Sequence, residues 1–335
     1  MRLLVTGATG FLGRRVVRDL AIRGHHVSAF LRSTSDAAPI REYVGKTVVG
    51  SITDPLAMVR AADSSDAVIH LATQHGTRGS HDSDLFRTNV AGTRVTAEAV
   101  KTAAVPFLLH VSSVAAVGYS TDGRPIDERH ENNFVPLQLR YHESRRLAEE
   151  EASDVRRYGV RVVIVNPAVL CGPCRLRGSF GEAVFVRVSG MVRWNPTGGI
   201  CVVDVDDAAR GVVAALERGR DGERYILGGE NVTYADLYRR AGAAAGLQYR
   251  GRPLQGTLLH GLATLNEAWG YMRKNPVSFG FAEATLAPLF LWYSSAKAER
   301  ELQFSPRPLE AILQQLILGY RRDGLLPNST LQATS

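Results

Sequence analysis

A glycine triplet near the start of the sequence constrains this chain more than any other feature. In "VTGATGFLGRRVV", Gly7, Gly10 and Gly13 stand between an apolar strand-like run and an amphipathic helical pattern. Glycine permits a tight turn, lets the backbone approach a phosphate, and allows close packing of the following helix. That helix offers free N–H groups and the positive end of its dipole to phosphates. The stretch therefore predicts a dinucleotide site at the start of an α/β fold.

Short β-branched runs alternate with helical patterns through the first half of the chain. Strands are expected over residues 2–8, 26–32, 46–52, 66–73, 107–117 and 161–167, with helices over 13–24, 54–65, 83–104 and 144–159. This rhythm is typical of a doubly wound parallel Rossmann sheet. A strand, a helix and a strand within residues 198–229 are expected to rejoin it.

The rest of the chain reads as a smaller C-terminal substrate-binding domain. We expect a dinucleotide-binding Rossmann domain over 1–165 plus about 200–228, and a lid domain over 166–199 plus 229–327. The lid is expected over the carboxyl ends of the strands, where open sheets bind ligands. Its apolar stretches hold Trp194, Trp269 and Trp292, although most of these aromatics are expected to be ordinary core. Residues 328–335 are expected to be disordered.

Charge and hydropathy exclude some classes of function. The net charge is +7, and all but four of the 40 basic residues are arginines scattered along the chain. Nucleic-acid binding would require clustering, so none is expected. The sequence has no apolar run of about 18 residues, and therefore no membrane span is expected. Because "MRLLVTGATG" begins directly with a strand and a glycine turn, we expect a cytoplasmic protein.

The three cysteines do not indicate a redox or metal site. Cys171 and Cys174 form "CGPC", but the motif lies deep in the chain instead of opening an early helix, so it is interpreted as coincidence. Three cysteines cannot complete an all-cysteine zinc site, and no histidine stands at ligand spacing. No metal is expected.

The spacing G-x-x-G-x-x-G in "TGATGFLG" closely resembles the extended short-chain dehydrogenase/reductase family, which is similar to NAD-dependent epimerases and dehydratases. Further similar stretches lie at the expected distances: "DAVIHLAT" (66–73), "NVAGT" (89–93), "VSSVAAVG" (111–118), "NPAVLCGP" (166–173), "VVDVDDAA" (202–209) and "YSSAKAERELQFSPRP" (293–308). The resemblance spans nearly the whole chain and is closest to the dihydroflavonol-reductase-like branch.

The end of the second expected strand indicates which cofactor is used. An acidic residue there would bind the ribose hydroxyls of NAD, but the sequence has Arg32 followed by Ser33. A guanidinium suits the 2′-phosphate of NADP(H), and Arg14 could assist it. The resemblance implies these further cofactor contacts: Gly7, Thr9, Gly10, Phe11, Leu12, Gly13, Ser51, Ile52, Leu71, Ala72, Thr73, Tyr141, Arg145, Pro167, Ala168 and Val169.

The stretch "YHESRR" is the candidate catalytic segment. Reduction of a ketone needs a hydride, a proton donor and a group that polarises the carbonyl. The resemblance implies Tyr141 as general acid, Ser113 as the polarising hydroxyl and Asn89 as support for the proton relay. On a helix, residues i and i+4 share a face, so Arg145 can approach Tyr141.

Arg145 stands where the family has lysine. It keeps the positive charge that favours the phenolate of a nearby tyrosine. A guanidinium cannot give up a proton, so a relay through this residue is closed. We expect an active enzyme whose tyrosine is reprotonated by a ribose hydroxyl, by water or by the substrate.

These residues predict an NADPH-dependent ketoreductase acting on a lipophilic substrate, aromatic or from secondary metabolism. By analogy, Gln74, His75, Val114, Leu170 and Cys171 should face the substrate. A nucleotide-sugar epimerase or dehydratase is the second interpretation, although Val114 and Ala115 replace the acidic pair that sugar dehydratases carry. A catalytically silent NADP-binding regulator is the third. A homodimer through residues 89–103 and 141–155 is expected by the same analogy.

Overall fold

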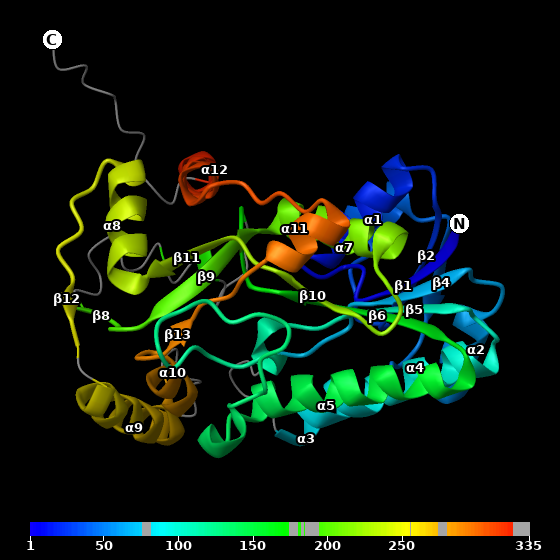
Figure 1. Ribbon diagram of the computed structural model, residues 1–335, viewed down its shortest axis with the longest axis horizontal. Helices are drawn as coiled ribbons and strands as arrows, with labels where there is room; N and C mark the ends of the chain where they lie inside the picture. The colour runs from blue at the N-terminus through cyan, green and yellow to red at the C-terminus, as the bar shows by residue number, and fades with distance from the viewer. Residues whose placement is uncertain are drawn as a thin grey trace, which may run out of the picture.

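A seven-stranded parallel sheet forms the centre of the molecule (Figure 1). The computed structural model describes residues 1–75, 82–173, 180, 181, 184, 194–254, 256–273 and 280–323. The strand order is β10-β6-β5-β4-β1-β2-β3, which reverses direction at β1 and so confirms the doubly wound α/β fold. The strands are β1 (Arg2–Thr6), β2 (His26–Leu31), β3 (Lys46–Val49), β4 (Ala67–His70), β5 (Phe107–Val111), β6 (Arg161–Pro167) and β10 (Arg224–Leu227).

Alternate side chains of these strands enter two separate hydrophobic cores. Leu3 and Val5 of β1 pack into one core, and Leu4 between them packs into the other. The first core lies under α1 (Gly13–Ile22), α7 (Val205–Arg218) and α11 (Ala296–Leu302). The second lies under α2 (Pro55–Ala62), α4 (Gly92–Thr102) and α5 (Arg140–Asp154), on the opposite face in Figure 1. Continuous apolar strands are required because both faces of the sheet are covered.

The helix expected over residues 83–104 is interrupted. It consists of α3 (Asp82–Phe86), a π-helical turn over Arg87–Ala91, and α4. The π turn contains the buried Asn89. Single π turns inside helices are frequent at functional sites because they redirect one side chain without ending the helix.

A second, smaller set of strands lies beyond the carboxyl ends of the central sheet. It contains β7 (Val169–Cys171), β9 (Gly199–Asp204), β11 (Glu230–Thr233) and β13 (Phe290–Leu291). The expectation that the strand before α7 rejoins the Rossmann sheet is wrong. Every residue of β9 is buried, and β9 pairs with β7, β11 and β13 instead, while α7 and β10 do return to the central sheet.

The remaining elements are distributed over both sheets. They are β8 (Trp194–Asn195), β12 (Arg252–Pro253), α8 (Tyr234–Ala245), α9 (Gly256–Arg273), α10 (Phe281–Leu286) and α12 (Leu309–Arg322), with short 3₁₀ turns η1 (Ala38–Tyr43), η3 (Val114–Ala116), η4 (Val135–Leu137) and η5 (Val155–Tyr158). The Trp269 side chain, Cys174 and the expected disordered tail 328–335 lie outside the described residues.

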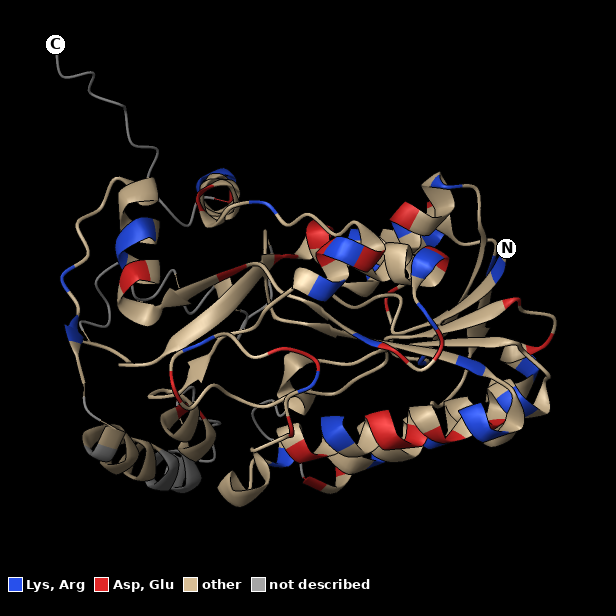
Figure 2. Cartoon of the chain, viewed as in Figure 1, with Lys and Arg blue, Asp and Glu red and all other residues tan. Residues whose placement is uncertain are grey.

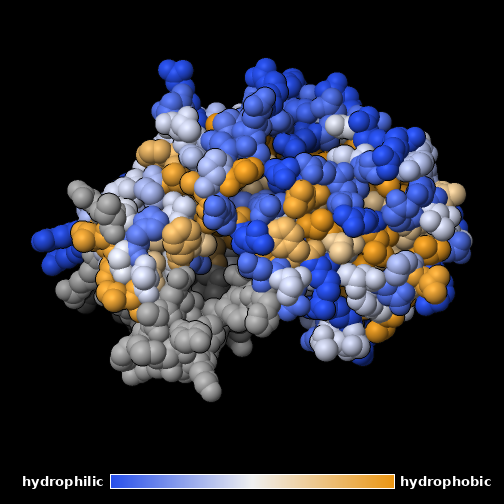
Figure 3. All heavy atoms as spheres, turned by 90° about the horizontal axis from the view of Figure 1, so that it is seen from below, coloured by the Kyte–Doolittle hydropathy of each residue, from blue (hydrophilic) through white to orange (hydrophobic). Residues whose placement is uncertain are grey.

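Charges of both signs are interspersed over the surface. Blue and red residues alternate along α5 and its neighbours in Figure 2. Seen from below, the face that includes α4 and α5 mixes hydrophilic with hydrophobic residues (Figure 3). The expected homodimer would use this face and stays a prediction. In the described part of the chain, no helix has the length and apolarity needed to cross a membrane.

Candidate cofactor and catalytic site

The glycine loop between β1 and α1 is too crowded for side chains. Gly7 has φ +69°, and a Cβ there would lie 2.6 Å from the carbonyl carbon of Leu71. A Cβ on Gly13 would lie 2.1 Å from the Gly7 carbonyl oxygen. The Gly10 amide donates to that same oxygen at 3.0 Å, which closes the turn. The loop can therefore present its backbone and the start of α1 to a pyrophosphate, as the spacing predicts.

The expected cofactor residues follow the carboxyl ends of neighbouring strands. Thr9, Phe11 and Leu12 follow β1, Leu71 to Thr73 follow β4, and Ala168 and Val169 follow β6, whose last residue is Pro167. Parallel strands end at one edge of a sheet, so these segments meet along a single edge. The arrangement fits an extended dinucleotide that crosses β1 between its two halves.

The outer end of this edge carries unpaired basic side chains. Arg32 and Ser33 follow β2 and are exposed, while Ser51 and Ile52 follow β3. Arg14, in the first turn of α1, has a buried Nε with no hydrogen-bond partner. Among the described residues, no carboxylate pairs with Arg14 or Arg32. Both guanidinium groups can therefore accept an anionic ligand.

Asn89 clamps the segment after β4 to helix α5. Its Oδ1 accepts hydrogen bonds from the Thr73 hydroxyl at 3.1 Å and from the Gln74 amide at 2.7 Å. Its Nδ2 donates to the Gln74 carbonyl at 2.9 Å and to the Ser144 hydroxyl at 3.0 Å. Ser144 in turn donates to the Tyr141 carbonyl at 2.7 Å. The amide of this one side chain in the π turn thus binds two segments, residues 73–74 and α5, and holds the first turn of α5.

Arg145 points into the protein interior and is only 1% exposed. Its Nη1 donates to the Thr73 hydroxyl at 2.9 Å, and its Nη2 donates to the Val111 carbonyl at 2.8 Å. Its buried Nε has no partner, and no carboxylate in the described part of the chain pairs with the guanidinium. Thr73 donates to Asn89 and accepts from Arg145, so Asn89, Thr73 and Arg145 form one continuous network.

Tyr141 and Ser113 lie on elements that pack together. Tyr141 is half-buried on the first turn of α5, with its ring 5.3 Å from that of His75. Ser113 lies two residues after the end of β5, and its hydroxyl accepts from the Ala115 amide at 3.2 Å, which starts the turn η3. Helix α5 packs against η3. The serine turn and the tyrosine helix are therefore neighbours, as the motif spacing predicts.

A buried carboxylate also joins the serine turn to α5. Asn166 donates from Nδ2 to the Ser113 carbonyl at 2.9 Å and to Glu149 Oε1 at 2.6 Å. Glu149 Oε2 accepts from Arg224 Nη2 at 2.6 Å. Glu149 lies one turn after Arg145 but is bound to these other partners. The backbone of Ser113 is thus held to α5 by a contact that the sequence analysis did not identify.

The side chain of His70 forms a second set of buried contacts that the sequence does not predict. Its Nδ1 lies 2.8 Å from the Thr6 hydroxyl, and its Nε2 lies 3.0 Å from the Thr93 hydroxyl. Thr93 donates to the Asn89 carbonyl at 2.6 Å, so it accepts from His70 Nε2–H. Thr6 accepts from the Ala72 amide and donates to His70 Nδ1. One neutral imidazole therefore connects β1, the segment after β4 and the π turn.

His110 stacks on His70 beneath Arg145, with ring centroids 5.4 Å apart. Burial, and secondly the charge of Arg145, lower the pKa of His70 to about 3. Burial lowers the pKa of His110 well below its usual value, with smaller contributions from Arg145 and His70. Both imidazoles are neutral near pH 7, so Arg145 is the permanent charge of this region.

The expected substrate residues divide into two groups. Gln74 and His75 lie in the segment that Asn89 clamps, beside Tyr141. Val114 is buried in the first core, and Leu170 packs against that core. Cys171 is only 1% exposed and packs with β9 and α12, so it is a core residue that does not face a cleft. Burial raises the pKa of its thiol to about 12, which disfavours thiolate chemistry.

Comparisons with known proteins agree with this geometry. The model of the family described as "NAD dependent epimerase/dehydratase family" matches residues 3–228. Sterol demethylase protein B of Methylococcus capsulatus is 28% identical over 330 residues, covering 97% of this chain and 100% of that protein. A putative dihydroflavonol 4-reductase of Synechocystis sp. is 30% identical over 248 residues, 72% of each chain. The crystal structure of gox2253 superposes with a TM-score of 0.84 at 32% identity, covering 97% of this chain and 99% of that one.

Proposed function

The chain belongs to the NAD dependent epimerase/dehydratase family, and from this premise we propose that it is an NADPH-dependent oxidoreductase that reduces a ketone. The observation that carries the proposal is the network of Asn89, Thr73 and Arg145 beneath the first turn of α5. The network lies beside the first turn of α5, which carries Tyr141, and α5 packs against the turn that begins at Ser113. The reductase named among the relatives supports the direction of the chemistry.

The side chains divide the work of carbonyl reduction. The bound cofactor supplies the hydride. Tyr141 donates the proton to the carbonyl oxygen, and the Ser113 hydroxyl polarises that oxygen. Asn89 holds the Gln74 backbone and the Ser144 hydroxyl, so it positions Tyr141 without touching the reacting atoms.

Arg145 supplies charge, and its proton does not leave. A guanidinium stays protonated at any working pH, so the relay that a lysine could provide is absent. Two of its nitrogens are bound to Thr73 and Val111, so its charge is held in a fixed place one helical turn after Tyr141 in α5. Tyr141 is therefore reprotonated from water or from the ligands.

The basic residues after β2 support NADPH over NADH. Arg32 is exposed beyond β2 and Arg14 lies in the first turn of α1, and neither has a carboxylate partner in the described structure. An acidic side chain would repel a 2′-phosphate, whereas two guanidinium groups would bind it in charge-assisted fashion.

A lipophilic ketone is the proposed substrate. The relative that matches over its whole length is named a sterol demethylase protein, which concerns a lipophilic substrate class. On the lid side, α9 and α10 bury a small apolar cluster of Leu259, Ala263, Ala284 and Ala287 against Trp194. The epimerase and dehydratase alternative keeps the support of the family name, but Val114 and Ala115 after Ser113 are buried and apolar and supply no carboxyl group.

The proposal is tested by titrating the protein with NADPH and NADH and then adding lipophilic ketones to the tighter complex. Loss of the nicotinamide absorbance is expected with NADPH in the wild type. Tyr141→Phe should lower kcat by about 10²–10⁴, because proton donation is lost, and should change the cofactor Kd far less. Tyr158→Phe, at an exposed tyrosine in η5, is the matched control. Tight NADPH binding with no turnover in any variant would instead support the regulator interpretation.

A further inference from the structure

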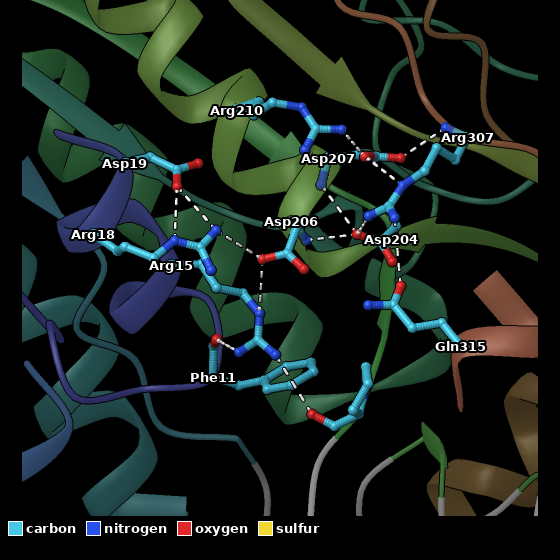
Figure 4. A network of polar contacts seen from close by, with 11 residues as sticks. Phe11, Arg15, Arg18, Asp19, Asp204, Asp206, Asp207, Arg210, Arg307 and Gln315 are labelled. Carbon is cyan, nitrogen blue, oxygen red and sulfur yellow. Dashed lines mark hydrogen bonds and ion pairs between the residues drawn. The ribbon is translucent and has the colours of Figure 1, made fainter. Parts of the chain in front are cut away.

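Arg15 in α1 lies where the phosphate loop, α7 and the segment after β7 meet (Figure 4). Its Nη1 donates to the Phe11 carbonyl at 2.8 Å, and its guanidinium carbon lies 4.6 Å from the centre of the Phe11 ring. Phe11 directly follows Gly10 in the loop expected to bind pyrophosphate. One side chain thus holds both the backbone and the ring of the loop's most exposed apolar residue.

The same guanidinium reaches the other side of the site. Its Nη2 donates to the Pro173 carbonyl at 3.4 Å. A Cβ on Gly172 would lie 3.6 Å from the Phe11 ring and 2.7 Å from Val205 in α7, so this segment packs directly on both. Pro173 ends the stretch that begins at Val169, which is expected to line the nicotinamide and the substrate. Arg15 therefore contacts the phosphate loop and the substrate-side segment simultaneously.

The acidic first turn of α7 holds Arg15 in place. Asp206 Oδ1 lies 3.3 Å from Arg15 Nε and 3.1 Å from Arg18 Nη2, and the Arg15 and Asp206 side chains are only 18% and 19% exposed. Asp204 and Asp207 of the same turn bind Arg307, which precedes α12. One helical turn consequently ties α1 to the C-terminal segment, as the dashed lines in Figure 4 show.

We propose that Arg15 is a positioning residue that makes the phosphate loop and residues 171–173 behave as one unit, so that cofactor binding at the loop orders the substrate-side segment. The functional half of this inference rests on the proposed NADPH-dependent activity. Arg15 touches neither the reacting atoms nor the catalytic tyrosine helix in the described contacts. Its effect passes through Phe11, Gly172 and Pro173.

Hydrogen exchange of the cofactor-free protein tests the physical link. Arg15→Met keeps the length of the side chain but removes its charge and its donors. We expect exchange at least tenfold faster in peptides covering both 8–14 and 168–173, with peptides of β5 unchanged. Asp206→Asn should give a smaller increase in the same two peptides, because Arg15 keeps its carbonyl partners. Arg23→Met, which removes an ion pair with Glu217 at the other end of α1, should change neither.

The outcomes separate this inference from the proposed function. Faster exchange in the loop alone, or in neither peptide, would overturn the link whatever the protein binds. If the wild type bound no nicotinamide nucleotide, the proposed function would fail, while the cofactor-free exchange would still decide the link.

Activity measurements test the functional half. Saturating NADPH should slow exchange at 168–173 in the wild type but much less in Arg15→Met. The KM for the ketone should rise about tenfold in Arg15→Met with kcat changed by less than about threefold. Equal protection of 168–173 in both proteins, or a loss confined to kcat, would show that Arg15 does not transmit cofactor binding.

Discussion

The two ends of the candidate cofactor site are built by different means. At the phosphate-loop end, the geometry is set by the backbone, because a Cβ on Gly7 or Gly13 would overlap main-chain atoms. At the α5 end, the geometry is set by side-chain hydrogen bonds that converge on Thr73. The phosphate-loop end can be recognised from glycine spacing alone. The geometry of the α5 end depends on which hydrogen-bond partner each polar group has in the folded chain.

This difference explains why the fold can hold a buried guanidinium at position 145. The guanidinium finds acceptors on Thr73 and Val111, and the two nearby imidazoles stay neutral. Burying a charged guanidinium costs free energy unless the group is hydrogen-bonded. Here hydrogen bonds to a hydroxyl and a carbonyl take the place of a carboxylate partner. The phosphate-loop end cannot accept a larger side chain at these glycines. At the α5 end, a different side chain can form a new set of hydrogen bonds.

The largest effect is expected at the steric end. Gly13→Ala would place a methyl group 2.1 Å from the Gly7 carbonyl oxygen, so the loop must move. The Kd for NADPH should rise by more than about 100-fold, or about 3 kcal/mol, in a fluorescence titration. Gly24→Ala is the control, because Gly24 ends the same helix with a positive φ but has open space around it. An unchanged Kd in Gly13→Ala would show that the loop is not sterically determined.

A smaller loss is expected at the hydrogen-bonded end. Thr73→Val removes the acceptor of Arg145 Nη1 and a donor to Asn89, leaving buried polar groups without partners. The free energy of unfolding should fall by about 2–3 kcal/mol in urea titrations. Thr88→Val removes a hydroxyl that donates to Gln74, which is only partly buried, whereas the partners of Thr73 are buried, so this variant should cost well under half of that. Equal losses in the two variants would contradict the role of Thr73 as the centre of the network.

The neutral imidazoles give a pH-dependent test of the same end. Burial lowers the pKa of His110 well below 6.5, so the unfolded chain takes up a proton between pH 7 and pH 5 and the folded chain does not. Stability therefore falls as the pH falls through this window, by about 2 kcal/mol for one such histidine. In His110→Phe the loss between pH 7 and pH 5 should be smaller by that amount. His26→Phe, at an exposed position, is the control for replacing a histidine with phenylalanine in urea unfolding at both pH values.

The smallest effect is expected at the exposed outer end of the loop region. Arg32→Ala should raise the Kd for NADPH about tenfold, or about 1.4 kcal/mol, because one exposed charge-assisted contact to the 2′-phosphate is lost. The Kd for NADH should not change. Arg41→Ala, an exposed arginine in η1, is the control. An equal loss of affinity for NADH would show that Arg32 does not bind the 2′-phosphate of NADPH.

The sequence predicts the parts of this molecule that local chemistry determines. The glycine loop and the seven strands of the central sheet follow from steric rules and hydrophobic periodicity, whereas α5 begins at Arg140, before the start of the helix predicted over 144–159. The π turn at Asn89 does not follow, because it depends on contacts with Gln74 and Ser144. The sheet to which β9 belongs does not follow either, because a buried strand has the same sequence pattern in both sheets.

Long-range polar contacts are the part that the sequence does not show. His70 and His110 each occupy the carboxyl end of an apolar strand, a signal that could have indicated a buried polar pair. Their hydrogen-bond partners, or lack of them, could not be foreseen. The contact of Arg15 with Pro173 joins residues 158 positions apart and needs the folded chain.

The central claim is that the buried cation of Arg145 makes the α5 end a working reductase site. The direct measurement is the rate of NADPH oxidation with a reducible ketone in the wild type, Arg145→Lys and Arg145→Met, run side by side. We expect activity in the wild type, a change within about tenfold for the lysine variant, and a loss of more than about 100-fold for methionine, which removes the charge. An inactive wild type together with turnover in Arg145→Lys would contradict the claim, because it would mean that the arginine has disabled the site.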